Sequence, residues 1–445
     1  MTTPGSVASV GVQTLSLKVA VYAVGFGTSV LISRALGPEG RGAYYFPVVA
    51  ATMLTTVATL GIEQANFYLM GSRRVDVARL WGQAGLVALV MGLCGLGALM
   101  VGPAVLPGLF AGTRPTWLWL AGLTIPLALH AQFGAGLLTL QGRVTWQFRV
   151  GLVAALVQVG LLTALQISVG LGVTAVLVAN LVTGCLTWML VVWPLRECRP
   201  WLAWDASLLR ATLAQALPLH LGVVLLYLHL RLDMFMVKAW SGDTALGHYS
   251  LAVTLAETVM LATDSLALAL LPRQIANTVP EAATLALRGA RINAVAALGA
   301  GAVWLVCGWP LVNLVYGRAF GPAYLPLVLL LPGMVFIGMQ RVCGAPALRS
   351  GRPWWVAGIM GASLALNAAL NVWWIPIFGP SGAALASTVS YVVSALVFLI
   401  WTIRLAGARW SAAVPRLADV GALWHGIGTT LRPAPARMGT GAKEI

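Results

Sequence analysis

The sequence predicts an all-α membrane protein with twelve transmembrane helices, arranged as two pseudo-symmetric six-helix lobes around a central cavity. Three observations lead to this fold class. Hydrophobic residues make up 59% of the 445 residues and charged residues only 9%, whereas a soluble domain carries about 25% charged residues. Apolar runs of roughly 20 residues, the length of a membrane-spanning helix, recur from end to end. In addition, the second half of the chain repeats features of the first.

Short polar or Gly/Pro-rich stretches separate the apolar runs and limit the expected helices. The first run contains Lys18 and lacks a small-residue cleavage site, which favours a retained helix over a signal peptide. We place the lobes at residues 1–205 and 206–405, followed by a cytoplasmic tail at 406–445 whose weak periodicity predicts disorder. The twelve expected spans are residues 12–33, 43–70, 80–102, 116–140, 148–170, 172–194, 213–237, 246–271, 291–315, 324–347, 354–377 and 381–403.

A polar, glycine-rich elbow, LISRALGPEGRGAYYF, occupies residues 31–46, and a similar elbow, MVKAWSGDTALGHYSL, occupies residues 236–251. Because each half contains six expected spans, both copies begin on the same side of the membrane. This predicts parallel repeats about an axis along the membrane normal, with a cavity between them. The offset of 205 positions aligns Gly37 with Gly242, Gly42 with Gly247, Tyr44 with Tyr249 and Tyr22 with Tyr227.

Lys and Arg residues are distributed unevenly between the two sides of this topology. With a cytoplasmic N-terminus, 20 of the 27 fall on the cytoplasmic side and five on the external side. Such a bias sets the orientation of membrane proteins, so we expect both termini in the cytoplasm. The net charge of +15 is dispersed over these loops rather than gathered on one surface, which argues against a nucleic-acid partner.

Three segments resemble a known family: the elbow at residues 31–46, GIEQANFYLMGSRR at 61–74, and RLDMFMVKAWSGDTALGHYSLA at 231–252. They are similar to polysaccharide flippases, the Wzx-type O-antigen members of the multidrug/oligosaccharidyl-lipid/polysaccharide exporter superfamily. The resemblance covers about residues 10–405. It implies a bacterial inner-membrane protein with two six-helix lobes, whose cavity opens to one side at a time and is bordered by the first and seventh spans. Related lipid II flippases typically carry two further carboxy-terminal spans, which this chain lacks after about residue 403.

No catalytic or nucleotide-binding motif stands out. GxxxxGK[ST] and HExxH are absent, the five histidines do not cluster in sequence, and the five cysteines show neither CxxC pairs nor metal-ligand spacing. We therefore expect no enzyme activity, no cofactor and no metal site. Transport would then be driven by an ion gradient, by the substrate gradient or by a partner.

Charges within apolar spans are informative, because each costs at least ~2.5–3.5 kcal/mol at a helix centre unless it is paired or solvated. Spacings of seven, four and seven place four polar residues of the seventh span on one helical stripe, and the first span has a matching stripe. Arginine offers phosphate a planar fork and lysine a point charge. The expected substrate-binding residues are Arg231, Lys18, Tyr22, Tyr227, His220, Arg34 and Lys238.

Each of these cations also has a structural alternative. Arg231 could pair with an acid on another helix, Lys18 could extend to lipid headgroups, and Arg34 and Lys238 could anchor the elbows at the interface. The buried acids have the same ambiguity, since each could hold a coupling proton or Na⁺, or neutralise a cation. The coupling-ion candidates are Asp233, Glu257, Asp264 and Glu63.

The resulting hypothesis is a flippase that moves an undecaprenyl-diphosphate-linked oligosaccharide across the inner membrane by alternating access. Its partners would be that lipid-linked glycan and membrane lipid, with a polymerase or ligase partner left open and the monomer as the functional unit. Four alternatives stay open: a lipid II-type flippase, a cation-coupled multidrug exporter of the same fold, a membrane scaffold and a sugar polymerase. The basic seventh-span stripe argues against the exporter, the embedded charges against the scaffold, and the short external loops against the polymerase.

Overall fold

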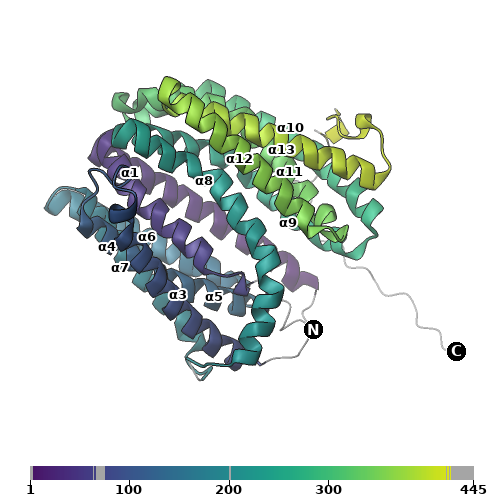
Figure 1. Cartoon of the computed structure of the whole chain (residues 1–445), viewed down its shortest axis with the longest axis horizontal. Helices are drawn as coiled ribbons and strands as arrows, with labels where there is room; N and C mark the ends of the chain where they lie inside the picture. Colours follow the sequence, from purple (N-terminus) through teal and green to yellow (C-terminus); the bar gives the residue numbers. More distant parts are fainter. Residues whose placement is uncertain are drawn as a thin grey trace.

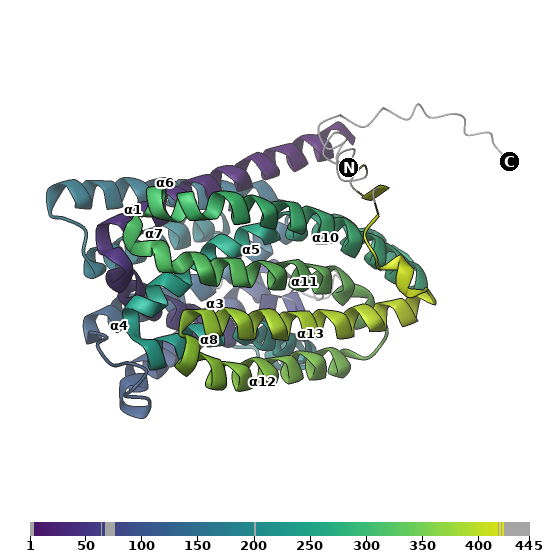
Figure 2. The same ribbon diagram turned by 90° about the horizontal axis from the view of Figure 1, so that it is seen from above.

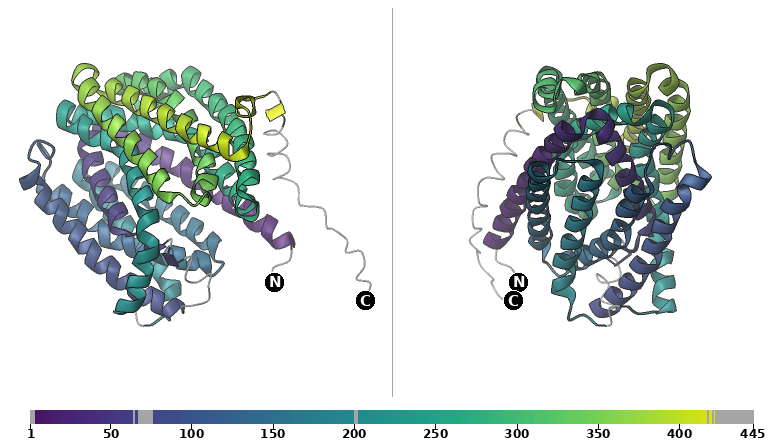
Figure 3. Two further views of the ribbon diagram at one scale, coloured as in Figure 1. Left: turned by 45° about the vertical axis from the view of Figure 1, so that its right-hand side comes forward. Right: turned by 90° about the vertical axis from the view of Figure 1, so that its left-hand side faces the viewer.

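The structure is a computed structural model, and it describes residues 4–63, 65–66, 76–199, 202–416, 418–419 and 421. Every regular element within these ranges is helical. Figure 1 shows the helices of the first half, in purple and blue, gathered on one side of those of the second half, in green and yellow, and Figures 2 and 3 show the same separation. The all-α class predicted from composition is confirmed.

The helices of the first half are α1 (Pro4–Ala58), α3 (Val77–Val105), α4 (Pro115–Gly122), α5 (Thr124–Leu140), α6 (Val144–Ser168) and α7 (Val173–Val192). Those of the second half are α8 (Ala206–Ala256), α9 (Met260–Ala276), α10 (Val279–Pro310), α11 (Tyr324–Arg349), α12 (Pro353–Phe378) and α13 (Pro380–Ala406). Short helical turns η2 (Glu257–Val259), η3 (Leu311–Tyr316) and η4 (Arg318–Ala323) complete the second half. A further turn, η1 (Trp193–Leu195), follows α7, and η5 (Trp410–Ala412) follows α13.

Two of these helices are far longer than a membrane is thick. α1 has 55 residues and α8 has 51, and at 1.5 Å per residue a helix of that length extends about 75 Å or more, against a hydrocarbon core of about 30 Å. Each is broken once, at Gly37 (φ 66°, ψ −177°) and at Gly242 (φ 78°, ψ −172°). Glycine adopts this backbone conformation without steric cost. The two glycines aligned by the repeat are therefore the two points at which the chain turns.

Ten helices in the described ranges are long and apolar enough to cross a membrane, where the sequence analysis places twelve spans. The difference arises largely because the expected first and second spans are continuous in α1, and the seventh continues into the eighth in α8. The eighth expected span then changes to a single helical turn at Glu257–Val259 before α9. The structure thus shows a multi-pass, all-helical membrane protein.

The two elbows pack against each other through reciprocal glycine contacts. A Cβ atom added to Gly42 would lie 1.8 Å from the Asp243 carbonyl oxygen, and one added to Gly247 would lie 1.9 Å from the Pro38 carbonyl oxygen. Pro38 and Asp243 are 205 positions apart, as are the two glycines. The same contact is therefore made twice, which is what an internal two-fold axis between α1 and α8 requires.

Hydrophobic packing is largely separate in the two halves. One core cluster joins helices α8 to α13, and the buried residues of the smaller clusters belong to the first half apart from Leu208 of α8. Phe46 of α1 is fully buried in the larger cluster, so the second part of α1 ties the halves together. Beyond α13, Asp419 accepts hydrogen bonds from Arg291 at 3.1 and 3.2 Å. Residues 422–445 of the predicted tail lie outside the described ranges.

Candidate functional site

A cavity of about 520 Å³ lies where α1 meets α8, between the two halves of the chain. Its wall combines aromatic, hydroxyl and charged groups drawn from α1, α8, η2, η3 and α11. The residues that matter for the chemistry are Tyr22, Ser29, Arg231, Glu257, Tyr316 and Arg341. Each half of the molecule supplies part of this wall, so any movement of one half against the other changes the cavity.

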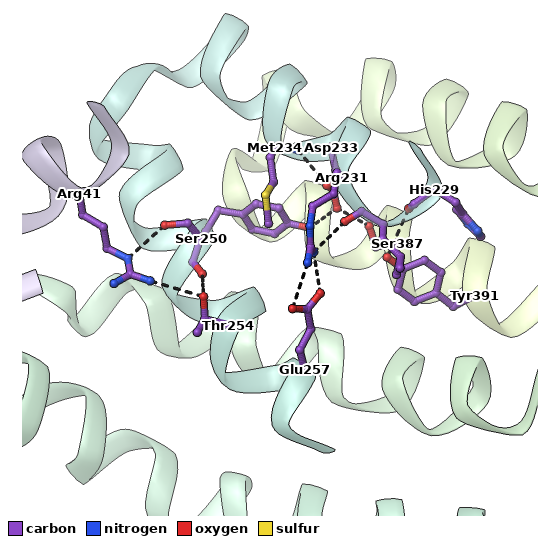
Figure 4. A network of polar contacts seen from close by, with 12 residues as sticks. Arg41, His229, Arg231, Asp233, Met234, Ser250, Thr254, Glu257, Ser387 and Tyr391 are labelled. Atoms are coloured by element: carbon purple, nitrogen blue, oxygen red, sulfur yellow. Dashed lines mark hydrogen bonds and ion pairs between the residues drawn. The ribbon is translucent and has the colours of Figure 1, made fainter. Parts of the chain in front are cut away.

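Arg231 and Glu257 form a two-point ion pair in the cavity wall (Figure 4). Arg231 Nη1 donates to Glu257 Oε1 at 2.5 Å, and Nη2 donates to Oε2 at 3.1 Å. The exposed fractions of the two side chains are 18% and 32%. This parallel geometry is the strong arrangement for a guanidinium and a carboxylate. Glu257 neutralises Arg231, and Arg341 on α11 is a second arginine in the same wall.

Arg41 is buried at the elbow, with an exposed fraction of 4%, and its partners are hydroxyl groups from both halves. It donates to Ser33 at 2.6 Å and Ser29 at 3.2 Å in α1, and to Ser250 at 3.1 Å in α8. Figure 4 shows Arg41 directed toward Ser250 and Thr254. Arg41 belongs to the elbow predicted at residues 31–46, and the close approach of the flanking glycines buries it between the halves.

A second polar group surrounds Asp233, on the face of α8 opposite the cavity. Tyr249 donates its hydroxyl to Asp233 Oδ2 at 2.5 Å, and Ser387 on α13 donates to the same oxygen at 2.8 Å. Asp233 is buried, and it belongs to none of the ion pairs found among the described residues.

The polar chain continues from Ser387 into the second half of the molecule. Asn367 of α12 donates to Ser387 at 3.3 Å and to Ser390 at 3.1 Å, and Asn371 donates to Asn367 Oδ1 at 2.8 Å. The buried Asn371 Oδ1 atom has no hydrogen-bond partner among the described residues. Buried oxygens of this kind are normally satisfied, so the network has acceptor capacity left for a proton donor or a cation.

Of the expected substrate-binding residues, Tyr22 and Arg231 line the cavity. His220 instead bonds the Val57 carbonyl oxygen at 3.0 Å, which ties α8 to α1. Tyr227 lies one helical turn before Arg231 on α8, and Lys18 lies partly exposed on α1, outside the cavity lining. The stripe predicted on α8 is therefore divided between a cavity residue and residues that hold helices together.

Arg34 and Lys238 lie at the elbows, away from the cavity lining, and each contacts the opposite half. Arg34 donates to the carbonyl oxygens of Leu314 at 2.5 Å and Val315 at 2.7 Å. Lys238 donates to the Ala111 carbonyl oxygen at 3.0 Å, and it pairs with Asp243 at 2.6 Å. Their place at the elbows agrees with the anchoring alternative, although the partners described here are protein groups.

The remaining acids are placed as follows. Glu63 accepts a hydrogen bond from Gln132 at 3.1 Å within the first half. Asp264 lies in α9, and its side chain is outside the part of the chain that the structure describes. No group of three His, Cys, Asp or Glu side chains in the described ranges is placed to hold a metal ion. Ser29 lies on the polar stripe predicted in the first span, whereas sequence reasoning missed Thr254 and Tyr316, because single hydroxyls in apolar spans carry no distinctive spacing.

Residues 7–274 match the model of a family described as polysaccharide biosynthesis protein. The chain belongs to this family. No curated protein matches it by sequence.

Solved structures share its fold. A lipid II flippase MurJ in an inward closed conformation aligns with a TM-score of 0.74 at 12% identity, covering 94% of this chain and 91% of that one. An inward-facing multidrug resistance MATE transporter of the MOP superfamily aligns with a TM-score of 0.66 at 17% identity, covering 89% and 98%. A MOP superfamily transporter from Pyrococcus furiosus gives 0.66 at 14%, covering 91% and 96%. The predicted family and the fold that these solved structures share are confirmed.

Proposed function

We propose that this member of the polysaccharide biosynthesis family is a flippase for a lipid-linked oligosaccharide carried on undecaprenyl diphosphate. The observation that carries the proposal is the cavity between the halves, with Arg231, Arg341 and Tyr22 in its wall. A diphosphate needs delocalised positive charge and hydrogen-bond donors, which arginine and tyrosine supply. The related lipid II flippase fold supports the same class of substrate, a polyprenyl diphosphate with a sugar headgroup.

The charge of the cavity wall favours this substrate over a cationic drug. Among the described residues of its lining, the charged ones are Arg231, Glu257 and Arg341, so arginines outnumber acids in that set. One structural neighbour is described by the reverse polarity of its binding pocket and a suggested different function, which supports using polarity to separate functions within this fold. A positively charged wall repels a cationic drug and attracts a diphosphate.

The proposed mechanism is alternating access between two six-helix lobes, with α1 and α8 each crossing the membrane twice, on either side of Gly37 and Gly242. In this structure the elbows are in contact, so the cavity is closed at the elbow end. The Lys and Arg bias places that end outside the cell and both termini inside. Transport would require the elbow contacts to break while the opposite ends of the lobes close.

Asp233 is the coupling-ion candidate that the geometry favours. Glu257 is already bound to Arg231 and Glu63 to an amide, whereas Asp233 has hydroxyl partners and is linked through Ser387 and Asn367 to Asn371, whose amide oxygen is unsatisfied among the described residues. Asp233→Asn keeps the shape and removes the charge. We expect it to abolish the response of export to an imposed proton or Na⁺ gradient while the folded protein remains. An unchanged gradient response would remove Asp233 from the coupling role.

The substrate class is tested with purified protein in liposomes. A fluorescent short-chain polyprenyl-diphosphate oligosaccharide is placed in one leaflet, and its appearance in the other is followed with a membrane-impermeant quencher. We expect translocation that empty liposomes and Arg231→Ala protein lack. Transport of a cationic dye without the lipid would favour the multidrug exporter, and transport of neither would favour the scaffold.

A further inference from the structure

A second cavity, of about 510 Å³, lies on the outer face of the second half and shares no lining residue with the cavity between the halves. It lies between α12 and α13, which run side by side at the outer surface in Figures 1 and 2. The lining residues used below are Ser350, Arg352, Trp355, Val397, Trp401 and Arg404. Nothing in the proposed transport cycle uses them.

Tryptophans on α12 locate the membrane at this face. Trp354 and Trp355 are exposed near its start, and Trp373 is exposed near its end. Eighteen residues separate Trp355 from Trp373, which is about 27 Å of helix and close to the ~30 Å hydrocarbon thickness. Tryptophan concentrates at both membrane interfaces. The cavity at the start of α12 therefore lies at headgroup depth and extends into the upper acyl region.

The cavity has a cationic end and an apolar end. A tight turn at Gly379 joins α12 to α13 in antiparallel fashion, so Arg352 at the start of α12 and Arg404 in the last turn of α13 lie at the same membrane surface. Val397 lies about two turns deeper than Arg404. This places two guanidiniums at phosphate depth and an aliphatic wall below them.

No acid among the described residues neutralises the two arginines. Neither side chain forms a hydrogen bond or ion pair with another of the described residues, and both residues are exposed. The lining residues that the structure describes include no acid. Basic pockets between transmembrane helices that face a bilayer attract anionic headgroups. A lipid with a negative phosphate and two acyl chains complements both ends of this cavity.

We propose that this cavity binds one anionic glycerophospholipid of the surrounding leaflet, with its phosphate between Arg352 and Arg404 and an acyl chain along Val397. The site faces the bilayer, so the membrane itself supplies the ligand. Trp355 and Trp401 line the cavity between these two ends, at the depth expected for the glycerol group of the lipid. The proposal is independent of which substrate the flippase moves.

The test is native mass spectrometry of the detergent-purified full chain, titrated with phosphatidylglycerol or with phosphatidylcholine of identical acyl chains. We expect one phosphatidylglycerol to bind in preference to phosphatidylcholine. An Arg352→Ala/Arg404→Ala protein should lose about 30-fold in this affinity, since each cation near an anionic headgroup contributes about fivefold. Arg288→Ala, an exposed arginine on α10 outside the cavity, should bind like wild type.

A second variant tests the apolar end without altering charge. Val397→Trp fills the wall and should lower phosphatidylglycerol binding, whereas Val393→Trp, one turn away on α13 and outside the lining, should not. This pair keeps the test valid if the double arginine variant fails to fold. Equal binding of both lipids to wild type would overturn the proposal. So would unchanged binding by Val397→Trp together with unchanged binding by a folded double arginine variant.

Discussion

Removal of Arg231 separates its structural and functional roles, because the structure gives it one strong partner. Arg231→Ala leaves the Glu257 carboxylate without its two hydrogen bonds of 2.5 and 3.1 Å. Breaking a fully buried pair costs about 3–5 kcal/mol, and an exposed pair contributes about 0–1 kcal/mol. With exposed fractions of 18% and 32%, this pair lies between those limits. We expect the free energy of unfolding to fall by about 2 kcal/mol.

The double variant Arg231→Ala/Glu257→Gln removes both charges, so no uncompensated carboxylate remains in the wall. Most of the lost stability should return, while export should stay abolished, because the cation that binds the diphosphate is still missing. Arg231→Lys should be partly active, since a point charge replaces the two-point fork. We therefore expect the double variant to regain stability without regaining transport.

Two assays decide the outcome: the melting temperature of the purified proteins in detergent, and export of the lipid-linked glycan in cells that lack their own flippase. Surface glycan is normalised to the amount of folded protein in the membrane. Normal export by the double variant would show that Arg231 serves only to balance Glu257. The cavity would then need another cation, and Arg341 would become the residue to test.

The other predictions concern the elbow, the loop before α8 and the topology. Gly42→Ala should prevent the closed elbow contact, so a cysteine introduced near the elbow should be labelled more readily from the external side. Gly97→Ala, whose added Cβ meets open space, should not change this labelling. Hydrogen bonds from the Leu208 amide, Ser207 and Arg79 lower the pKa of Asp205, so its contribution to stability is present above its unfolded pKa of about 4 and is lost as pH falls below that value. The difference in melting temperature between wild type and Asp205→Ala should therefore shrink on acidification. Reporter fusions should score external at 239–245 and cytoplasmic after 405, and an external tail would contradict the parallel repeat.

The elbows could be predicted from sequence because their chemistry is local. A backbone position that needs a positive φ favours glycine wherever it occurs in a chain. Gly37 and Gly242 have φ values of 66° and 78° at aligned positions. Helical periodicity places Asp233, two residues from Arg231, on nearly the opposite face of α8, and in the structure its carboxylate bonds Ser387, away from the cavity. Which residues share one face of a single helix could therefore be predicted from the sequence.

The partners of those faces could not be predicted in the same way. Pairing of Arg231 with an acid was one of two alternatives left open, and choosing Glu257 requires knowing that the break of α8 at Gly242 brings position 257 back beside position 231. Arg41 shows the same limit more strongly. In sequence it lies in a polar elbow and has the pattern of a loop cation, but its burial depends on the contact of Gly42 with the backbone of the other half. Only the fold brings those two segments together.

The duplication explains why the elbow end would open as one unit. Gly42 packs on Asp243 and Gly247 packs on Pro38 across the same interface. The cations follow the same symmetry. Arg34 donates hydrogen bonds to the carbonyl groups of Leu314 and Val315 in the opposite half, and Lys238 donates one to the carbonyl group of Ala111 in the first half. Residues 111 and 316 are equivalent at the offset of 205, so the acceptors of the two sets of hydrogen bonds differ by one or two positions only. Because a rotation of one half moves both copies of each contact together, neither set of hydrogen bonds breaks while the other stays formed. Packed interfaces of this kind switch between discrete states rather than deform gradually. A repeated elbow thus provides the two-state barrier that alternating access needs, from one stretch of sequence used twice.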